Sequence, residues 1–343
     1  MSITSLVDYL KARKTEYITG AMEVTLSAIT GFFIAGIILQ SMGYNALSIF
    51  NIMITGGVSD LSHLAGKSAP LVMTGLAFSI PLMAGVFNIG GESQLYMGAL
   101  AGLVGTYYSG NILIGLVLGF LAGAFWGWLM AALRVYRGIN EVITAIMLNW
   151  TAYYFIIYLI IKYLPNPEKP YMSIQLPQSE MLSMNTTFLL SVLGALAAYY
   201  IIYYTDLGYK MRVSGFNPKT AQYSGFDPSK SILFSMALGG GLAGFGGALL
   251  VIGVSSGIDT TMTSLYGLGF TGIGVGLLGR NHPIGIIFSS LFFADLIIGG
   301  QWVELETGAP PYVSDTIIGI IVIALSAPYA YKKLVELYRL RRR

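Results

Sequence analysis

The chain has 343 residues, of which 55% are hydrophobic and only 10% are charged. Because a soluble domain carries about a quarter of its residues as charged side chains, this composition excludes an ordinary soluble protein and indicates a membrane protein. The chain has no cysteine, which excludes disulfides, thiolate metal sites, iron–sulfur clusters and a cysteine nucleophile. The net charge of +3 is small, so the positions of the charges carry more information than their sum.

Apolar runs long enough to cross a bilayer follow one another along the chain. The first, Ile18 to Gln40, is too long for a signal-peptide core and has no small-residue cleavage site after it, so we predict a retained helix. Further runs lie at about 69–87, 93–108, 112–133, 139–161, 187–204, 231–252, 266–279, 283–300 and 313–330. We therefore predict an all-α polytopic membrane protein of about ten transmembrane helices, several of them short or broken by Gly and Pro. The runs at 93–108 and 266–279 are either spans or re-entrant segments.

The basic residues predict the orientation, because loops rich in Lys and Arg stay in the cytoplasm. With both termini inside, 16 of the 19 Lys and Arg residues fall on the cytoplasmic side. The prediction then has a cytoplasmic tail at 1–17, a transmembrane domain at 18–330 and a basic cytoplasmic tail at 331–343, whose arginines would attract anionic lipid. The longest cytoplasmic loop is about 205–230, and the external loops are about 41–68, 162–186, 253–265 and 301–312.

Two kinds of pattern imitate nucleotide-binding motifs. Gly66-Lys67-Ser68 ends like a phosphate-binding P-loop, but Leu61 stands where that motif needs glycine. Dinucleotide-type glycine spacing occurs inside two apolar runs that lack the required strand and turn, at Gly239, Gly241 and Gly244 and at Gly274, Gly276 and Gly279. Small residues four apart, such as Gly240 with Gly244 and Gly272 with Gly276, instead predict close helix packing.

The sequence contains no pattern that indicates an enzyme or a metal site. His63 and His282 are far apart and have no neighbouring cluster of ligands, so we expect no bound metal. No nucleophile and base occur at a credible spacing, and we predict no catalytic residue.

Polar residues inside the membrane are costly and are therefore candidates for function. Asn88, Glu92 and Gln94 interrupt two apolar runs, and an interrupted helix is a common way to form a polar transport pathway. The alternative is a short, solvated cytoplasmic turn. Asp295, in the ninth predicted span, is a further pathway candidate, although a structural hydrogen bond explains it at least as well.

The segment from Gly138 to Trp150 offers two more pathway candidates. At helical spacing Glu141, Thr144 or Ala145, and Asn149 share one inward face. Asn140 is also a suitable helix cap, and Glu141 then favours the positive first turn; both interpretations can hold together.

The loop at 205–230 contains clear start and stop signals. Asn217 with Pro218 starts a short helix, Gly225 ends it, and Asp227 with Pro228 starts the next one. Such a helix between two spans is either a rigid handle for a soluble partner or an ordinary ordered loop. The glycine-dense run from Gly267 to Gly279 meets Arg280 and Pro283, which is not typical of an ordinary straight helix.

Four phrases together resemble a known family: FNIGGESQ (87–94), NEVITAIMLN (140–149), GFNPKTAQYSG (215–225) and LLGRNHPIG (277–285). They are similar to the permease subunits of ATP-binding cassette importers in the branched-chain amino-acid and ribose superfamily, and most closely to its purine nucleoside branch. The resemblance covers about residues 65–328. Gly91, Ser93, Gly274 and Gly276 depart from the residues usual in that family, which affects the choice of substrate more than the fold.

The resemblance implies a set of partners. Such permeases pair with a second permease, here expected to form a heterodimer, bind two ATP-binding domains that hold ATP and Mg²⁺, and receive substrate from an external binding protein. The chain itself would bind no cofactor and no nucleic acid polymer, and would lie in the plasma membrane of a prokaryote. The helix near Asn217, Pro218, Lys219, Tyr223 and Gly225 would be the coupling helix, with Tyr223 and Lys219 as contacts to the ATPase.

The sequence leaves three functions open. The first is a nucleoside permease subunit that works by alternating access, with a ribose-like monosaccharide permease as its nearest alternative. The second is a self-contained secondary transporter or channel, which would transport without an ATPase. An intramembrane enzyme is the third.

Overall fold

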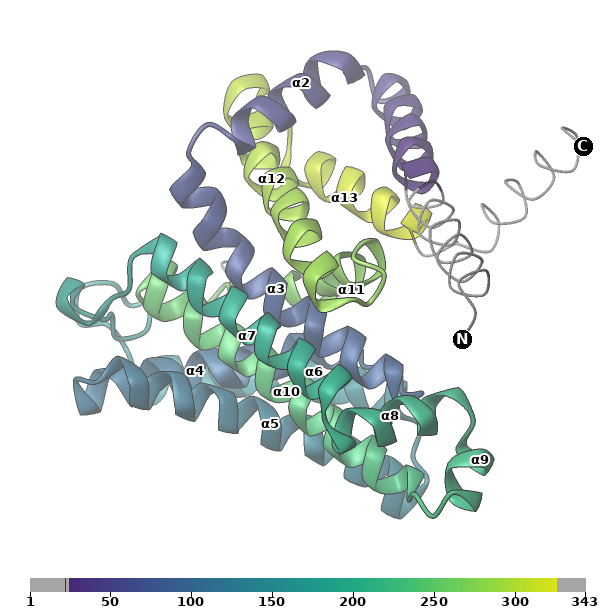
Figure 1. Cartoon of the computed structure of the whole chain (residues 1–343). Coiled ribbons are helices and arrows are strands. Elements are labelled where there is room, and N and C mark those ends of the chain that lie inside the picture. Colours follow the sequence, from purple (N-terminus) through teal and green to yellow (C-terminus); the bar gives the residue numbers. More distant parts are fainter. Residues whose placement is uncertain (1–21, 23–24, 264, 326–343) are drawn as a thin grey trace, which may run out of the picture. The chain divides into compact units, whose positions relative to one another are not determined.

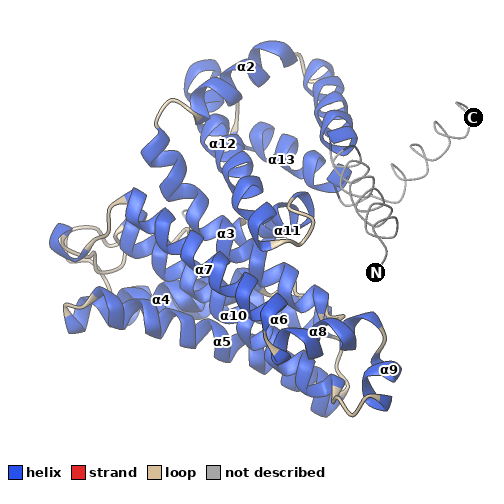
Figure 2. Ribbon diagram, in the orientation of Figure 1, coloured by secondary structure: helices blue, strands red, loops and turns tan. Residues whose placement is uncertain are grey.

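The structure is a computed structural model that describes residues 22, 25–263 and 265–325. The predicted tails at 1–17 and 331–343, and the end of the last predicted span, lie outside these residues. Throughout the described ranges the fold is made of helices joined by loops, as Figure 2 shows. Two isolated antiparallel bridges, Pro165 with Ser173 and Met172 with Asp259, join loop segments.

The helices occur in the following order (Figure 1). A helix at Thr25–Ser41 comes first. The others are α2 (Ala46–Gly57), α3 (Leu61–Met83), α4 (Gly91–Ser109), α5 (Ile112–Arg137), α6 (Glu141–Tyr163), the short η1 (Gln178–Glu180), α7 (Met184–Tyr204), α8 (Asp206–Phe216), α9 (Pro218–Tyr223), α10 (Pro228–Leu250) with its π-helical end η2 (Val251–Ser255), α11 (Leu268–Leu278), α12 (Pro283–Thr307) and α13 (Pro311–Leu325).

Within the described residues, five helical segments are long and apolar enough to cross a membrane. They are Ile112–Arg137, Glu141–Tyr163, Gln178–Tyr204, Pro228–Ser255 and Pro283–Thr307. Together with the shorter apolar helices they show an all-α, multi-pass membrane fold, while the count of ten spans and the orientation of the termini stay predictions.

By its contacts the chain divides into two compact units, residues 57–295 and residues 1–56 with 296–343. In the larger unit α10 is the central helix and packs against α3, α4 and α5. Its most apolar window is 78% buried, against 28% for the window of α5. Helix α10 is therefore the core of this unit, and α5 presents much of its surface outward.

Glycine allows α10 to approach its neighbours closely. A methyl group on Gly240 would meet the backbone of Gly123 and Gly127 in α5, and one on Gly244 would meet that of Gly119 and Gly123. These contacts confirm the predicted role of the Gly240–Gly244 spacing in helix packing, because backbones can approach this closely only where side chains are absent. The glycine spacing in α10 is thus explained by close packing of α10 on α5.

In the smaller unit, the helix at Thr25–Ser41 packs on α13, and α2 packs on the second half of α12. A Cβ on Gly31 would meet Ala324 and Ile321, and one on Gly56 would meet Trp302. The Ser314 hydroxyl in α13 donates to the carbonyl of Gly300 in α12 (3.1 Å).

The predicted external loop at 41–68 is wrong as a loop, because α2 and the start of α3 occupy much of it. Asp60 caps α3 by accepting hydrogen bonds from the N–H groups of Ser62 and His63. Helix α2 has only twelve residues, about 18 Å, which is too short to cross about 30 Å of hydrocarbon, so its sequence does not predict a span. The predicted loop at 301–312 is likewise shortened, because α12 continues to Thr307.

Candidate functional site

The polar phrase at 87–94 joins α3 to α4 and lies inside the protein. Asn88, Glu92, Ser93 and Gln94 are each at most 2% exposed. The side-chain amide of Asn88 donates to the carbonyl of Ala77 (2.9 Å), so the chain turns back by six residues of α3, or about 9 Å, before α4 begins. The alternative of a solvated cytoplasmic turn is therefore wrong, because a solvated turn would leave these side chains exposed. We call residues 84–94 the helix break.

Two amide side chains hold the helix break from within. The Asn88 amide donates to Gln94 Oε1 (3.0 Å) and the Gln94 amide donates to Asn88 Oδ1 (3.2 Å). Asn88 Oδ1 also accepts from the N–H of Gly90 (3.0 Å). Buried polar groups are costly unless paired, and this reciprocal pair satisfies both side chains as well as free backbone groups of the break.

Asn149 joins the break to α6. Its Oδ1 accepts from the N–H of Ser93 (3.2 Å), and its Nδ2 donates to the carbonyl of Ile89 (3.2 Å). The structure thus brings Asn88, Glu92, Gln94 and Asn149 together, as the pathway hypothesis requires, and shows that the amides bond to the interrupted backbone.

Glu92 holds the start of α11. Its carboxylate accepts from the N–H groups of Gly267 (2.5 Å), Gly269 (2.6 Å) and Phe270 (3.2 Å), and from the hydroxyl of Tyr96 (2.5 Å). The first N–H groups of a helix have no partner within it and carry partial positive charge, so a carboxylate is a well-matched cap. Here the cap comes from a residue about 175 positions earlier in the chain.

Helix α11 is a half-helix. Its eleven residues extend about 16 Å, which is roughly half of the hydrocarbon core. It runs beside α3 in the same direction, with Gly272 against Thr74 and Gly276 against Ser79 and Phe78. Residues 266–279 were predicted to be either a span or a re-entrant segment. The length of α11 favours the re-entrant segment.

The turn after α11 is tightly held. Arg280 and Asn281 have positive φ angles of 54° and 55°. The Ser79 hydroxyl donates to Asn281 Oδ1 (3.0 Å), which ties the turn to α3. His282 lies against the rings of Tyr199 and Tyr203, and burial lowers the pKa of His282, which favours the neutral imidazole.

Tyr96, the partner of Glu92, belongs to a group of five aromatic residues that the sequence did not predict. We call them the aromatic cluster: Tyr96, Trp150, Tyr153, Tyr154 and Tyr266. Tyr153 is its centre, with ring centroids 6.3 Å from Tyr96, 5.7 Å from Trp150, 5.3 Å from Tyr154 and 6.2 Å from Tyr266. The residues come from three separate segments, so no local sequence pattern could have grouped them.

Glu141 and Asp295 lie away from these contacts. Glu141 forms an ion pair with Arg134 at the other end of α6, where Asn140 caps the helix through the N–H groups of Val142 and Ile143. The predicted cap is thereby confirmed. Asp295 lies against Gly57, and its Oδ1 is buried without a hydrogen-bond partner in the described part of the chain.

The 205–230 loop is folded as its start and stop signals predict. Asn217 caps α9 by accepting from the N–H groups of Lys219 and Thr220, Gly225 has a φ of +79°, and Asp227 caps α10 through the N–H of Ser229. Helix α9 is exposed at Lys219 and Tyr223, and the Tyr223 side chain is 94% exposed. It therefore presents a rigid turn to the surroundings.

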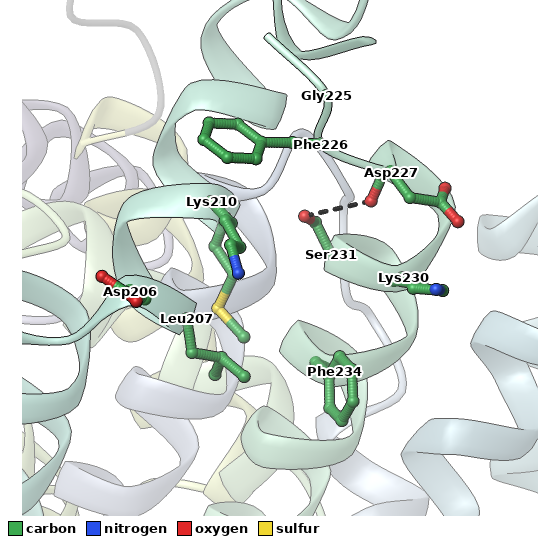
Figure 3. Close-up of a pocket in the computed structure, with 10 residues that line it drawn as sticks. Asp206, Leu207, Lys210, Gly225, Phe226, Asp227, Lys230, Ser231 and Phe234 are labelled. Atoms are coloured by element: carbon green, nitrogen blue, oxygen red, sulfur yellow. Dashed lines mark hydrogen bonds between the residues drawn. The ribbon is translucent and has the colours of Figure 1, made fainter.

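A pocket of about 520 Å³ lies between α8 and α10 beside α9 (Figure 3). Leu207 and Met211 from α8 and Phe234 from α10 supply apolar walls. The Lys210 ammonium lies 5.9 Å from the ring centroid of Phe226, and the Ser231 hydroxyl donates to the carbonyl of Asp227 (3.4 Å). The face that carries α9 is thus hollowed as well as exposed.

No three His, Asp or Glu side chains meet as a potential metal site anywhere in residues 25–263 or 265–325.

Comparisons with known proteins cover most of the chain. The family model described as "Branched-chain amino acid transport system / permease component" matches residues 60–326. The guanosine ABC transporter permease protein NupP of Bacillus subtilis is 28% identical over 90% of this chain and 93% of its own length. The glucose ABC transporter permease protein TsgB13 of Haloferax volcanii is 28% identical, covering 90% and 87%. The nucleoside ABC transporter permease protein NupB of Lactococcus lactis is 27% identical, covering 91% of both. No solved structure matches.

Proposed function

Because this chain belongs to the family of permease components of branched-chain amino acid transport systems, we propose that it is the permease subunit of an ATP-binding cassette importer for nucleosides. The observation that carries the substrate class is its similarity, along nine tenths of the chain, to permeases for guanosine and for nucleosides. The buried helix break supports a transport role, because polar groups deep in a membrane protein are expensive to maintain.

The proposed mechanism is alternating access. ATP and Mg²⁺ bind to two partner ATPase domains, and their binding and hydrolysis shift the permease between inward-open and outward-open packings. A partner can shift that equilibrium only by the difference between its contacts with the two states. In this mechanism the chain forms part of the translocation pathway and carries a coupling helix, and the partner ATPases supply the free energy.

Helix α9 is the proposed coupling helix. We expect Tyr223 and Lys219 to contact a groove of the ATPase, because they are exposed on a short helix that is capped at its start by Asn217 and turned at its end by Gly225. Pro218 fixes its first turn. A rigid helix transmits a movement of the ATPase to the membrane helices better than a flexible loop does.

The helix break is the proposed pathway region. Asn88, Gln94 and Asn149 keep the interrupted backbone paired, and Glu92 keeps α11 attached to α4. Half-helices that end within the membrane are typical of transport sites. Glu141 and Asp295 stay predictions as further pathway residues.

The other partners follow from the family resemblance. A second, different permease would complete the path, and an external binding protein would deliver the nucleoside. The assembly would lie in the plasma membrane of a prokaryote.

A sugar is the second candidate substrate, because the glucose permease TsgB13 matches this chain at the same 28% identity as the guanosine permease. Purified chain in proteoliposomes, with and without its ATPase, second permease and binding protein, tests all these points together. We expect ATP-dependent uptake of labelled guanosine by the complete assembly and none by the chain alone. Uptake of glucose instead of guanosine would overturn the substrate class, and full uptake by the chain alone would overturn the ABC permease assignment.

A further inference from the structure

We propose that the aromatic cluster is the place where the planar base of the transported nucleoside stacks during its passage. The proposal rests on the proposed function and assigns it a set of residues: Tyr153 and Tyr266 as the stacking rings, with Tyr96, Trp150 and Tyr154 around them.

The first observation is depth. Tyr153 lies in the middle of α6, about 18 Å along the helix from Glu141 and about 15 Å from Tyr163. Tyrosines that anchor a helix at the membrane surface lie near its ends, as Tyr158 and Tyr163 do. Tyr153 is ten or more residues from either end of α6, which is outside the range of such an anchor.

The second observation is the state of the phenol groups. The Tyr96 hydroxyl is used by Glu92, whereas neither the Tyr153 nor the Tyr266 hydroxyl has a hydrogen-bond partner in the part of the chain that the structure describes. A phenol facing hydrocarbon would lose its hydrogen bonds at considerable cost. These two hydroxyls are therefore available to hydrogen-bond a polar ligand.

The third observation is the link to the half-helix. Tyr266 directly precedes Gly267, whose N–H is bonded to Glu92, and its side chain is 57% exposed. Trp150 and Tyr154 are 49% and 64% exposed on the same side of α6. The cluster thus has accessible aromatic surface, and any movement of α11 relative to α6 would change the distance between Tyr266 and Tyr153.

The chemistry of the cluster fits a neutral nucleoside. Every nucleobase has a π face that stacks on aromatic side chains, and tyrosine hydroxyls both donate and accept hydrogen bonds, as ribose hydroxyls and base edges require. The Glu92 carboxylate beside the rings is already saturated with donors, and its charge would repel a phosphate. The site is therefore expected to admit nucleosides and to exclude nucleotides.

The test uses the complete transporter in proteoliposomes with labelled guanosine. Tyr153→Ala and Tyr266→Ala should each raise the KM for guanosine by roughly 5- to 150-fold, the range expected for the loss of one stacking partner. Tyr153→Phe keeps the ring and should stay much closer to the unchanged protein. Tyr158→Ala, on the same helix but outside the cluster, is the matched control and should leave the KM unchanged.

A second measurement does not depend on transport. A variant with Trp126, Trp128 and Trp302 replaced by Phe keeps only Trp150 in the described part of the chain. Its fluorescence should be quenched by guanosine but not by ribose or by guanosine monophosphate at the same concentration.

The outcomes separate the two proposals. If guanosine is carried with an unchanged KM in both alanine variants, or does not quench Trp150, the stacking site is overturned while the nucleoside permease stands. If the unchanged transporter carries glucose and no guanosine, the proposed substrate itself is wrong.

Discussion

The helix break and residues 205–230, which contain the proposed coupling helix and are called the coupling segment below, are both polar interruptions between apolar helices, yet they are built in opposite ways. In the helix break the polar side chains are buried and bond to backbone groups of distant segments, as Glu92 does with the start of α11. In the coupling segment the polar side chains cap their own helices, as Asn217 does for α9, and Tyr223 remains exposed.

The difference shows how one fold can hold a buried polar interruption, our proposed transport path, and an exposed one, our proposed docking surface. Buried polar groups must be fully paired, so the helix break is fixed by many mutual contacts and each member depends on the others. An exposed capped helix needs only local hydrogen bonds, which leaves its outward side chains free for a partner. Substitutions in the helix break should therefore affect folding, and those in the coupling segment should affect coupling.

The largest effect is expected for Glu92→Ala. The substitution leaves the N–H groups of Gly267, Gly269 and Phe270 and the Tyr96 hydroxyl without their acceptor, and we expect a loss of about 3–5 kcal/mol in the free energy of unfolding. Unfolding of the purified permease in detergent measures it. Glu168→Ala, at an exposed carboxylate, is the control, and equal stability of the two variants would contradict the capping role of Glu92.

A smaller loss is expected for Asn149→Leu. Its two hydrogen bonds, with the N–H of Ser93 and the carbonyl of Ile89, would be lost inside the protein, at a cost of about 1–3 kcal/mol. The same unfolding assay applies. The control is Thr151→Ala, at an exposed position on the same helix, which should lower the free energy of unfolding by less than about 0.5 kcal/mol. An equal loss in the two variants would show that the hydrogen bonds from Asn149 to the helix break do not stabilise the protein.

In the coupling segment, Asn217→Ala should cost about 1 kcal/mol, the usual value of a helix cap, and only locally. Hydrogen exchange at the amides of Lys219 and Thr220, which the cap protects, is the appropriate measurement. Asn217→Asp keeps an acceptor and should preserve the protection. Unchanged exchange in the alanine variant would show that α9 does not depend on its cap.

The smallest effect on stability is expected for Tyr223→Ala combined with Lys219→Ala, because both side chains are exposed. The free energy of unfolding should change by less than about 0.5 kcal/mol, while ATP hydrolysis by the partner no longer drives uptake. The ratio of nucleoside carried to ATP hydrolysed is measured in proteoliposomes, with Gln222→Ala on the same helix as control. Normal coupling would remove the two residues from the interface with the ATPase.

Local patterns predicted much of this molecule correctly. The caps at Asn140, Asn217 and Asp227 and the turn at Gly225 lie where their residue types indicate, because a cap depends on neighbours within three positions. The packing role of Gly240 and Gly244 was also correct, since few other uses exist for glycines four apart in an apolar helix.

Other features could not be predicted, because they depend on contacts between distant segments. Nothing near Glu92 in the sequence indicates that it caps a helix that begins at Leu268. The grouping of Tyr96, Tyr153 and Tyr266 has the same origin, and α2 was missed because twelve residues are too few to register as a span.

By itself, the sequence determined that this is a helical, multi-pass membrane protein and where its coupling segment starts and stops, because hydrophobicity and helix capping act over short stretches of chain. Only the tertiary structure decided that the polar phrase at 87–94 is buried, that α11 is too short to cross a bilayer by itself, and that aromatic rings gather beside Glu92. The reason is physical: a buried polar group must find its partners, and in this fold those partners come from helices far apart in the chain.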